Sequence, residues 1–250
     1  MPRVPRKSYN TSLFHIIVQG INREYIFKKD EYIEQYLKLM KKYKEIQKIE
    51  ILAYCIMNNH AHLLLETKDS KELYKFMHKI NMLYANYYNK KEKRTGYVFR
   101  DRYKSEPIYS EEYLWNCMIY IHMNPVEANM TNDMSKYKYS SYNEYLGQRS
   151  IITEESMKLV FGSANYIEQF EYIHKKEIEE IFSDIDEDKK DKCKKIIAKF
   201  LIGNNTNINS IKNNKNLLKK LTIELKDKNK ISYRIIETEI GVGRETLRNL

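Results

Sequence analysis

The segment NNHAHLLL at residues 58–65 holds two of the six histidines of the chain, on alternate positions of an apolar run. In a strand, side chains alternate between faces, so His60 and His62 are expected side by side on one face. Neutral imidazole is a common metal ligand, and two imidazoles on one face suit a shared ion. A pair of histidines that is merely hydrogen-bonded within a sheet is the alternative, and the spacing leaves both interpretations open.

A second group of side chains lies in the segment YIHMNP at residues 120–125. On a helix, positions four apart share a face, so Tyr120 and Asn124 point the same way, and Pro125 is expected to end the helix. An amide oxygen is a reasonable third ligand for a hard ion such as Mg²⁺ or Mn²⁺. His122 points elsewhere on such a helix. Tyr120 is one of 22 tyrosines, so a structural role is its alternative.

The elements that must position these side chains follow from hydrophobic periodicity and turn residues. In chain order they are a strand at 13–18, a helix at 29–43, strands at 49–57 and 60–66 joined by a tight turn at Asn58-Asn59, a helix at 73–88, an extended segment within 98–108 and a helix at 110–125. The order is that of a ferredoxin-like α+β fold, a four-stranded antiparallel sheet with two helices on one face. The opposite face is then free for a site.

The first domain is expected to end near Gly147, which gives a domain at residues 1–149 and a helical extension at 150–250. Residues 231–250 contain two short helical segments that are separated by glycines. Their apolar spacing is typical of a helix-turn-helix, and an ordinary helical hairpin is the alternative.

The charge is basic and uneven. Lys and Arg number 44 against 34 Asp and Glu, for a net charge of +10, and residues 1–150 hold 25 of the former against 17 of the latter. Such a surplus favours polyanions, most often nucleic acid, although a lysine-rich solvated surface is the alternative. The cysteines are too few and scattered for a disulfide framework, and no apolar run is long enough to span a bilayer. The N-terminus is not that of a signal peptide, so a cytoplasmic protein without membrane contact is expected.

Basic side chains at several places are candidates for contacts with phosphates. Arg100, Arg102 and Lys104 alternate, so a strand would present all three on one face, and protection of an edge strand by charge is the alternative. The full set of candidates is Arg3, Arg6, Lys7, Arg23, Arg100, Arg102, Lys104, Arg244 and Arg248.

Five segments then occur in a telling order, and together they cover most of residues 8–147. They are FHIIVQGINREYIF (14–27), MNNHAHLLLE (57–66), TGYVFRDRYKS (95–105), YIHMNPVEA (120–128) and YKYSSYNEYLG (137–147). In this order they resemble the REP-associated tyrosine transposases, a branch of the IS200-like, single-tyrosine HUH transposases. The HUH motif is two histidines around a hydrophobic residue. The last hundred residues are more loosely similar to helical extensions in some members.

The resemblance implies a role for each matched residue. Tyr120 corresponds to the nucleophile, His60 and His62 to the metal-binding pair, and Asn124 to a third ligand, where some relatives have glutamine. It also implies Mg²⁺ or Mn²⁺, single-stranded or hairpin DNA as partner, a monomer or homodimer, and DNA nicking and joining through a 5′-phosphotyrosine with release of a 3′-hydroxyl.

The physical chemistry agrees with these roles. A phosphodiester under attack by a phenolate gathers negative charge, which a divalent ion stabilises, and the covalent link conserves the bond energy for rejoining. Two alternatives stay open. One is a non-catalytic nucleic-acid-binding protein on the same fold, and the other is a two-histidine metallohydrolase that forms no bond to DNA.

Overall fold

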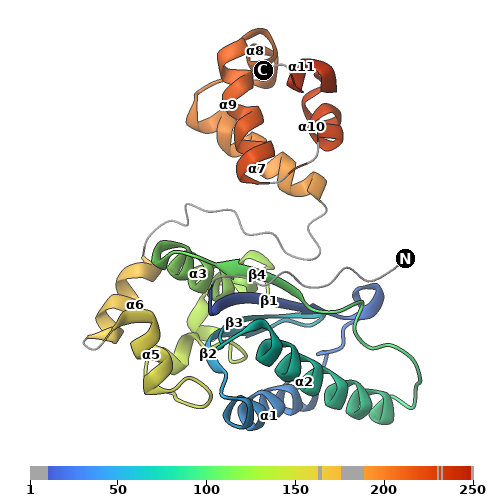
Figure 1. The fold of residues 1–250 in the computed structure, drawn as a ribbon, viewed down its shortest axis with the longest axis vertical. Helices are drawn as coiled ribbons and strands as arrows, with labels where there is room; N and C mark the ends of the chain where they lie inside the picture. Colours follow the sequence, from blue (N-terminus) through green and yellow to red (C-terminus); the bar gives the residue numbers. More distant parts are fainter. Residues whose placement is uncertain (1–10, 163–164, 176–188, 230, 232, 249–250) are drawn as a thin grey trace. The chain divides into compact units, whose positions relative to one another are not determined.

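The computed structural model describes residues 11–162, 165–175, 189–229, 231 and 233–248. The chain divides into two compact units, Met1–Phe182 and Ser183–Leu250, which are described separately. The first unit contains β1 (Leu13–Gln19), the 3-10 turn η1 (Ile21–Arg23), α1 (Asp30–Gln47), β2 (Glu50–Ile56), β3 (His60–Glu66), α2 (Ser70–Lys91), β4 (Lys104–Ile108), α3 (Glu111–Glu127), the 3-10 turn η2 (Met134–Lys136), α4 (Tyr142–Tyr145), α5 (Glu154–Phe161) and α6 (Tyr166–His174) (Figure 1).

The four strands form one antiparallel sheet in the order β2-β3-β1-β4. This is the strand order of the ferredoxin-like plan, so the predicted fold class is confirmed. A tight hairpin joins β2 to β3, as predicted, and the Met57 nitrogen donates to the His60 carbonyl at 2.8 Å. Neither Asn58 nor Asn59 has a positive φ. Their carbonyl oxygens instead accept from the backbone nitrogens of Phe27 and Gly20, at 2.8 Å each, which ties the hairpin to the segment after β1.

Gly20, directly after β1, is required by a close approach of backbone. A Cβ at this position would lie 2.4 Å from the carbonyl oxygen of Glu24. The glycine therefore allows the chain to fold back over the end of β1 before α1 begins.

Helices α1 and α2 pack against each other on one face of the sheet, as predicted (Figure 1). The side chain of Asp69 caps α2 by accepting from the nitrogens of Lys71 and Glu72. Aromatic side chains fill the space between the helices, and the rings of Tyr36 and Tyr84 lie 5.1 Å apart, edge to face. Their burial removes a large apolar area from water and stabilises this layer.

Helix α3 lies on the opposite face, over β2 and β3, so that face is covered and not free as the sequence suggested (Figure 1). The helix begins at the Ser110 cap, whose hydroxyl accepts from the Tyr113 nitrogen at 3.2 Å. The prediction that Pro125 ends the helix was wrong, because α3 continues to Glu127. A proline in the last turns removes only one backbone hydrogen bond, which a helix already held by packing tolerates.

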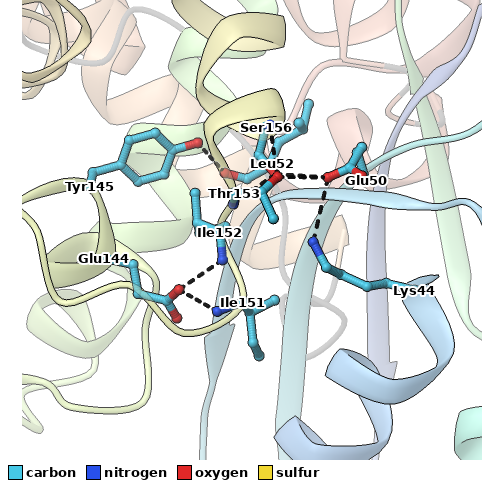
Figure 2. A network of polar contacts seen from close by, with 9 residues as sticks. All are labelled: Lys44, Glu50, Leu52, Glu144, Tyr145, Ile151, Ile152, Thr153 and Ser156. Carbon is cyan, nitrogen blue, oxygen red and sulfur yellow. Dashed lines mark hydrogen bonds and ion pairs between the residues drawn. The ribbon is translucent and has the colours of Figure 1, made fainter.

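The chain after α3 returns to the outer edge of β2, where two buried carboxylates hold it (Figure 2). Glu144 is 4% exposed and accepts from the backbone nitrogens of residues 150, 151 and 152 at 2.8, 2.6 and 2.8 Å. Glu50 accepts from the hydroxyls of Thr153 and Ser156 at the start of α5 and pairs with Lys44. The compact unit therefore extends past residue 149, and the boundary at 149/150 stays a prediction.

The second unit is helical. It contains α7 (Lys189–Gly203), α8 (Ile208–Asn213), α9 (Lys215–Ile223), the π-helical turn η3 (Glu224–Lys228), α10 (Tyr233–Ile240) and α11 (Arg244–Arg248). The last two helices are separated at the glycines, as expected, and bury Ile236, Ile240 and Leu247. Their function as a helix-turn-helix stays a prediction. Within the described residues, every helix is too short or too polar to cross a membrane.

Replacement of Glu144 by glutamine is expected to destabilise the first unit. Three backbone N–H groups and the Tyr54 hydroxyl, at 2.5 Å, donate to this buried carboxylate. An amide nitrogen in place of one oxygen would face donors, so Glu144→Gln should lower the free energy of unfolding by about 2–4 kcal/mol. Denaturant unfolding of the full chain measures this change. Glu34→Gln, at an exposed position of α1, is the matched control and should change stability by less than about 0.5 kcal/mol.

Candidate active site

His60 and His62 stand at the start of β3, on the face of the sheet that α3 covers. Their ring centroids are 5.0 Å apart and the ring planes are nearly perpendicular. His62 is 0% exposed and His60 is 8% exposed, so both imidazoles lie largely out of water. The predicted neighbourhood of the two rings is thus seen in the structure.

Each of these imidazoles uses its Nδ1 in a contact with a neighbouring side chain. His60 Nδ1 lies 2.7 Å from the amide oxygen of Asn59. His62 Nδ1 lies 3.1 Å from Nε2 of His15, a residue of β1. An imidazole whose Nδ1 is held in this way directs its Nε2 toward a ligand, the usual arrangement of metal-binding histidines.

Tyr120 reaches the same place from α3. Its ring lies edge-on to His62, with centroids 5.5 Å apart, and to His15, at 5.9 Å. The tyrosine is 5% exposed. The helix that covers the sheet therefore brings a phenol next to the imidazoles, although Tyr120 and His62 are far apart in the sequence.

Asn124 follows one helical turn after Tyr120 and is 3% exposed. Its amide nitrogen donates to the Tyr120 carbonyl oxygen at 2.8 Å, so the side chain braces the helix at the tyrosine. Within the described ranges, no three or more His, Cys, Asp or Glu side chains are grouped to hold a metal ion. The assignment of Asn124 as a ligand stays a prediction.

His15 is a site residue that sequence reasoning missed. It is 1% exposed, and its ring stacks on His62 with centroids 5.3 Å apart. Its Nδ1 lies 4.0 Å from a carboxylate oxygen of Glu106 on β4. The available signal was the alternation of His15 with Ile17 on a predicted strand, but the pairing of β1 with β3 had to be known to place it.

The predicted row of three basic residues on one strand was wrong, because β4 begins only at Lys104. Arg100 nevertheless lies beside the histidines. Its Nη1 donates to the Gln19 amide oxygen at 3.2 Å, and Gln19 pairs directly with His60 across β1 and β3. Arg102 is exposed two residues further on. Lys104 pairs with Glu106 at 2.7 Å.

The other predicted DNA-contacting residues are dispersed. Arg23 is exposed in η1. In the second unit, the Arg244 Nε pairs with Glu237 at 2.8 Å, and the Arg248 guanidinium lies 5.6 Å from the centroid of the Tyr233 ring. Arg3, Arg6 and Lys7 lie outside the described residues.

His122 points away from the site, as predicted, and connects α3 to later parts of the first unit. Its Nδ1 lies 2.8 Å from His174 Nε2, and its Nε2 lies 2.7 Å from the Ser141 hydroxyl. His174 Nδ1 donates to the Phe170 carbonyl oxygen at 2.8 Å. Every position in this chain is satisfied by neutral imidazoles, and burial lowers the pKa of His122 and brings the pKa of His174 to about 4.

Comparisons with known proteins bear on the first unit. Residues 8–124 match the family model described as "Transposase IS200 like". Among solved structures, a REP-associated tyrosine transposase bound to a REP hairpin matches with a TM-score of 0.51 and 15% identity, over 59% of this chain and 87% of that one. At this identity the likeness shows the fold. No curated protein matches the chain.

Acid is expected to weaken the first unit through the two buried imidazoles. Their pKa values are lowered in the folded state, so between about pH 6.5 and 4 the unfolded chain binds more protons and stability falls with pH. For His174 the full loss is about 3 kcal/mol, from about 1.4 kcal/mol per pKa unit. Denaturant unfolding of the full chain across this range measures it.

The variant His174→Gln tests the assignment, because a glutamine does not titrate and should make the fall shallower. His78→Gln, at an exposed position of α2, should keep the wild-type slope. An unchanged slope in His174→Gln would refute the assignment.

Proposed function

Residues 8–124 belong to the IS200-like transposase family, and on this premise we propose that the protein nicks and rejoins single-stranded DNA with Tyr120 as nucleophile. The observation that supports it most is the edge-on contact of the Tyr120 ring with His62, at 5.5 Å, on the buried face of the sheet. A phenol next to two imidazoles combines a covalent nucleophile with donors for a divalent ion.

The proposed reaction is a transfer of a phosphoryl group between oxygens. The Tyr120 phenol oxygen forms a bond to phosphorus and gives up its proton, while the bond from phosphorus to the 3′-oxygen breaks and that oxygen takes up a proton. The product is a 5′-phosphotyrosine and a free 3′-hydroxyl. Attack of a 3′-hydroxyl on the phosphotyrosine reverses the exchange and joins two strands without loss of the bond energy.

The side chains at the site fit a divalent metal ion, Mg²⁺ or Mn²⁺ in our proposal. His60 and His62 lie side by side, and their Nδ1 atoms have partners at 2.7 and 3.1 Å, which suits ligation through Nε2. Asn124 is the proposed third protein ligand. When bound, the ion supplies positive charge for the non-bridging oxygens of the phosphodiester.

The proposed DNA partner is a single-stranded or hairpin segment. The solved transposase that the chain resembles is bound to a REP hairpin. Arg100, held at Gln19 beside His60, is suited to contact a phosphate near the reacting bond, and the exposed Arg102 and Arg23 extend the basic surface. Arg3, Arg6 and Lys7 are proposed to add contacts. Whether the protein acts as a monomer or a homodimer does not enter this mechanism.

The second unit is proposed to add DNA contacts or to influence the choice of site, through Arg244 and Arg248. Removal of everything after Gly147 is a poor test, because it would also take away the N–H groups that hold Glu144 and the helix α5. Substitution of the two arginines in the full chain avoids this difficulty.

Replacement of Tyr120 by phenylalanine is expected to abolish the covalent adduct, because only the nucleophilic oxygen is lost. Labelled hairpin DNA is incubated with the full chain and Mn²⁺, and label that migrates with protein is measured on a denaturing gel. Tyr120→Phe should give no adduct while its Kd for DNA stays within about twofold of wild type. Tyr109→Phe, at a tyrosine that is 67% exposed, is the control and should keep the adduct.

The same gel separates the alternatives. A pure binding protein gives no adduct even as wild type. A two-histidine hydrolase cleaves DNA without an adduct and remains active as Tyr120→Phe. Removal of divalent ions with EDTA should abolish the wild-type adduct.

Substitution of Arg100 and Arg102 by glutamine is expected to weaken DNA binding in a salt-dependent way. The double variant should bind several-fold more weakly, and its plot of log K against log salt should flatten by about 1 unit of slope. The control is Lys41→Gln/Lys42→Gln, at exposed positions of α1 on the other side of the sheet, and Arg244→Gln/Arg248→Gln in the same titration tests the second unit. An unchanged slope in the Arg100/Arg102 variant would remove these residues from the interface.

A further inference from the structure

Three polar side chains from three neighbouring strands form a row on the face that α3 covers. His15 on β1 pairs directly with Glu106 on β4, so both side chains stand on the same side of the sheet. His62 on β3 pairs with Ile17, two residues further along β1, which puts His15 and His62 in diagonal contact. The row therefore runs Glu106, His15, His62, with His15 in the middle.

We propose that His15 is a positioning residue which, together with Glu106, fixes the tautomer of His62. The inference rests on the proposed function in that it assigns His62 as a metal ligand. It goes further because it names what sets the state of that ligand, and it gives a buried histidine outside the HUH motif a role in the site.

The positions of the protons follow from the order of the row. A carboxylate has no proton to donate, and Glu106 Oε2 lies 4.0 Å from His15 Nδ1, an ion-pair distance longer than a hydrogen bond. The negative charge favours the His15 tautomer with its proton on Nδ1. Lys104 holds the other carboxylate oxygen at 2.7 Å, which keeps Glu106 in this place.

A neutral His15 with its proton on Nδ1 has a lone pair on Nε2. That nitrogen lies 3.1 Å from His62 Nδ1, so the proton of this hydrogen bond must come from His62. His62 is then protonated at Nδ1 and has its lone pair on Nε2, the form in which an imidazole binds a metal ion through Nε2.

His60 reaches the same state by a separate contact. Its Nδ1 lies 2.7 Å from the amide oxygen of Asn59, which only accepts a proton. Both histidines of the pair therefore have Nδ1 as donor, one toward an amide and the other toward His15. Two unrelated contacts with the same outcome support a role in preparing the pair, beyond filling space in the core.

The tautomer can be observed directly, in the absence of metal and DNA. Two-bond ¹H–¹⁵N correlation spectra of the full chain with ¹⁵N-labelled histidine distinguish Nδ1–H from Nε2–H rings. The proposal requires His62 to be the Nδ1–H tautomer in the wild type, and an Nε2–H ring for His62 would overturn it. Because no catalysis is involved, this result is independent of whether the protein forms an adduct with DNA.

Two substitutions of His15 separate packing from proton placement. His15→Gln offers an amide oxygen that can accept from His62 Nδ1, whereas His15→Phe keeps an aromatic ring against His62 without an acceptor. Titration of each full-length variant with Mn²⁺, followed by the electron paramagnetic resonance of the free ion, should show about 10–100-fold weaker binding for His15→Phe. His15→Gln should remain within several-fold of wild type.

The control is His78→Phe, at an exposed position of α2, which should bind Mn²⁺ like the wild type. Equal Mn²⁺ affinity of His15→Phe and wild type would overturn the proposal, as would equal losses in His15→Phe and His15→Gln, which would indicate a packing role. If the wild type binds Mn²⁺ and His62 has the required tautomer but no adduct forms with DNA, the proposed function fails while the positioning role of His15 stands.

Discussion

The contact of one helix with one face of the sheet is the constraint on which the site depends. Strand pairing alone gathers His15 and His62, because β1 and β3 are neighbours. The phenol of Tyr120 arrives only because α3 lies across β2 and β3 with that side chain turned inward. A small rotation of α3 about its axis would separate the oxygen from the imidazoles while leaving the sheet unchanged. Chemistry at this place thus depends on how firmly the helix is held.

The structure holds α3 from its outer side as well. His122, two residues after Tyr120, faces away from the sheet and binds Ser141 and His174. The same Ser141 hydroxyl accepts from the Tyr54 nitrogen of β2 at 2.9 Å, so the helix, the sheet and α6 share one polar connection. Asn124 adds a brace within the helix. Residues that look peripheral to the reaction therefore determine where the nucleophile lies.

The fold was predictable because each element has its own local signal. Strand 60–66 was placed to the residue, and α1 and α2 extend only a few residues beyond the predicted ranges. The errors arose where tertiary contacts decide. Pro125 looked like a stop but lies within a well-packed helix, and the extended segment at 98–103 does not join β4. His15 was overlooked because its meaning depends on strand register, which no local pattern gives.

The connection from His122 to His174 also bears on the order in which the molecule matures. A chain leaves the ribosome from its N-terminus, so all four strands and α3 are available before α6 has been made. The partner that secures the outer side of the nucleophile's helix is thus the last part of the first unit to appear. A nascent chain can complete its sheet while the tyrosine is not yet fixed. The finished catalytic geometry therefore coincides with completion of the whole unit, well past the final strand.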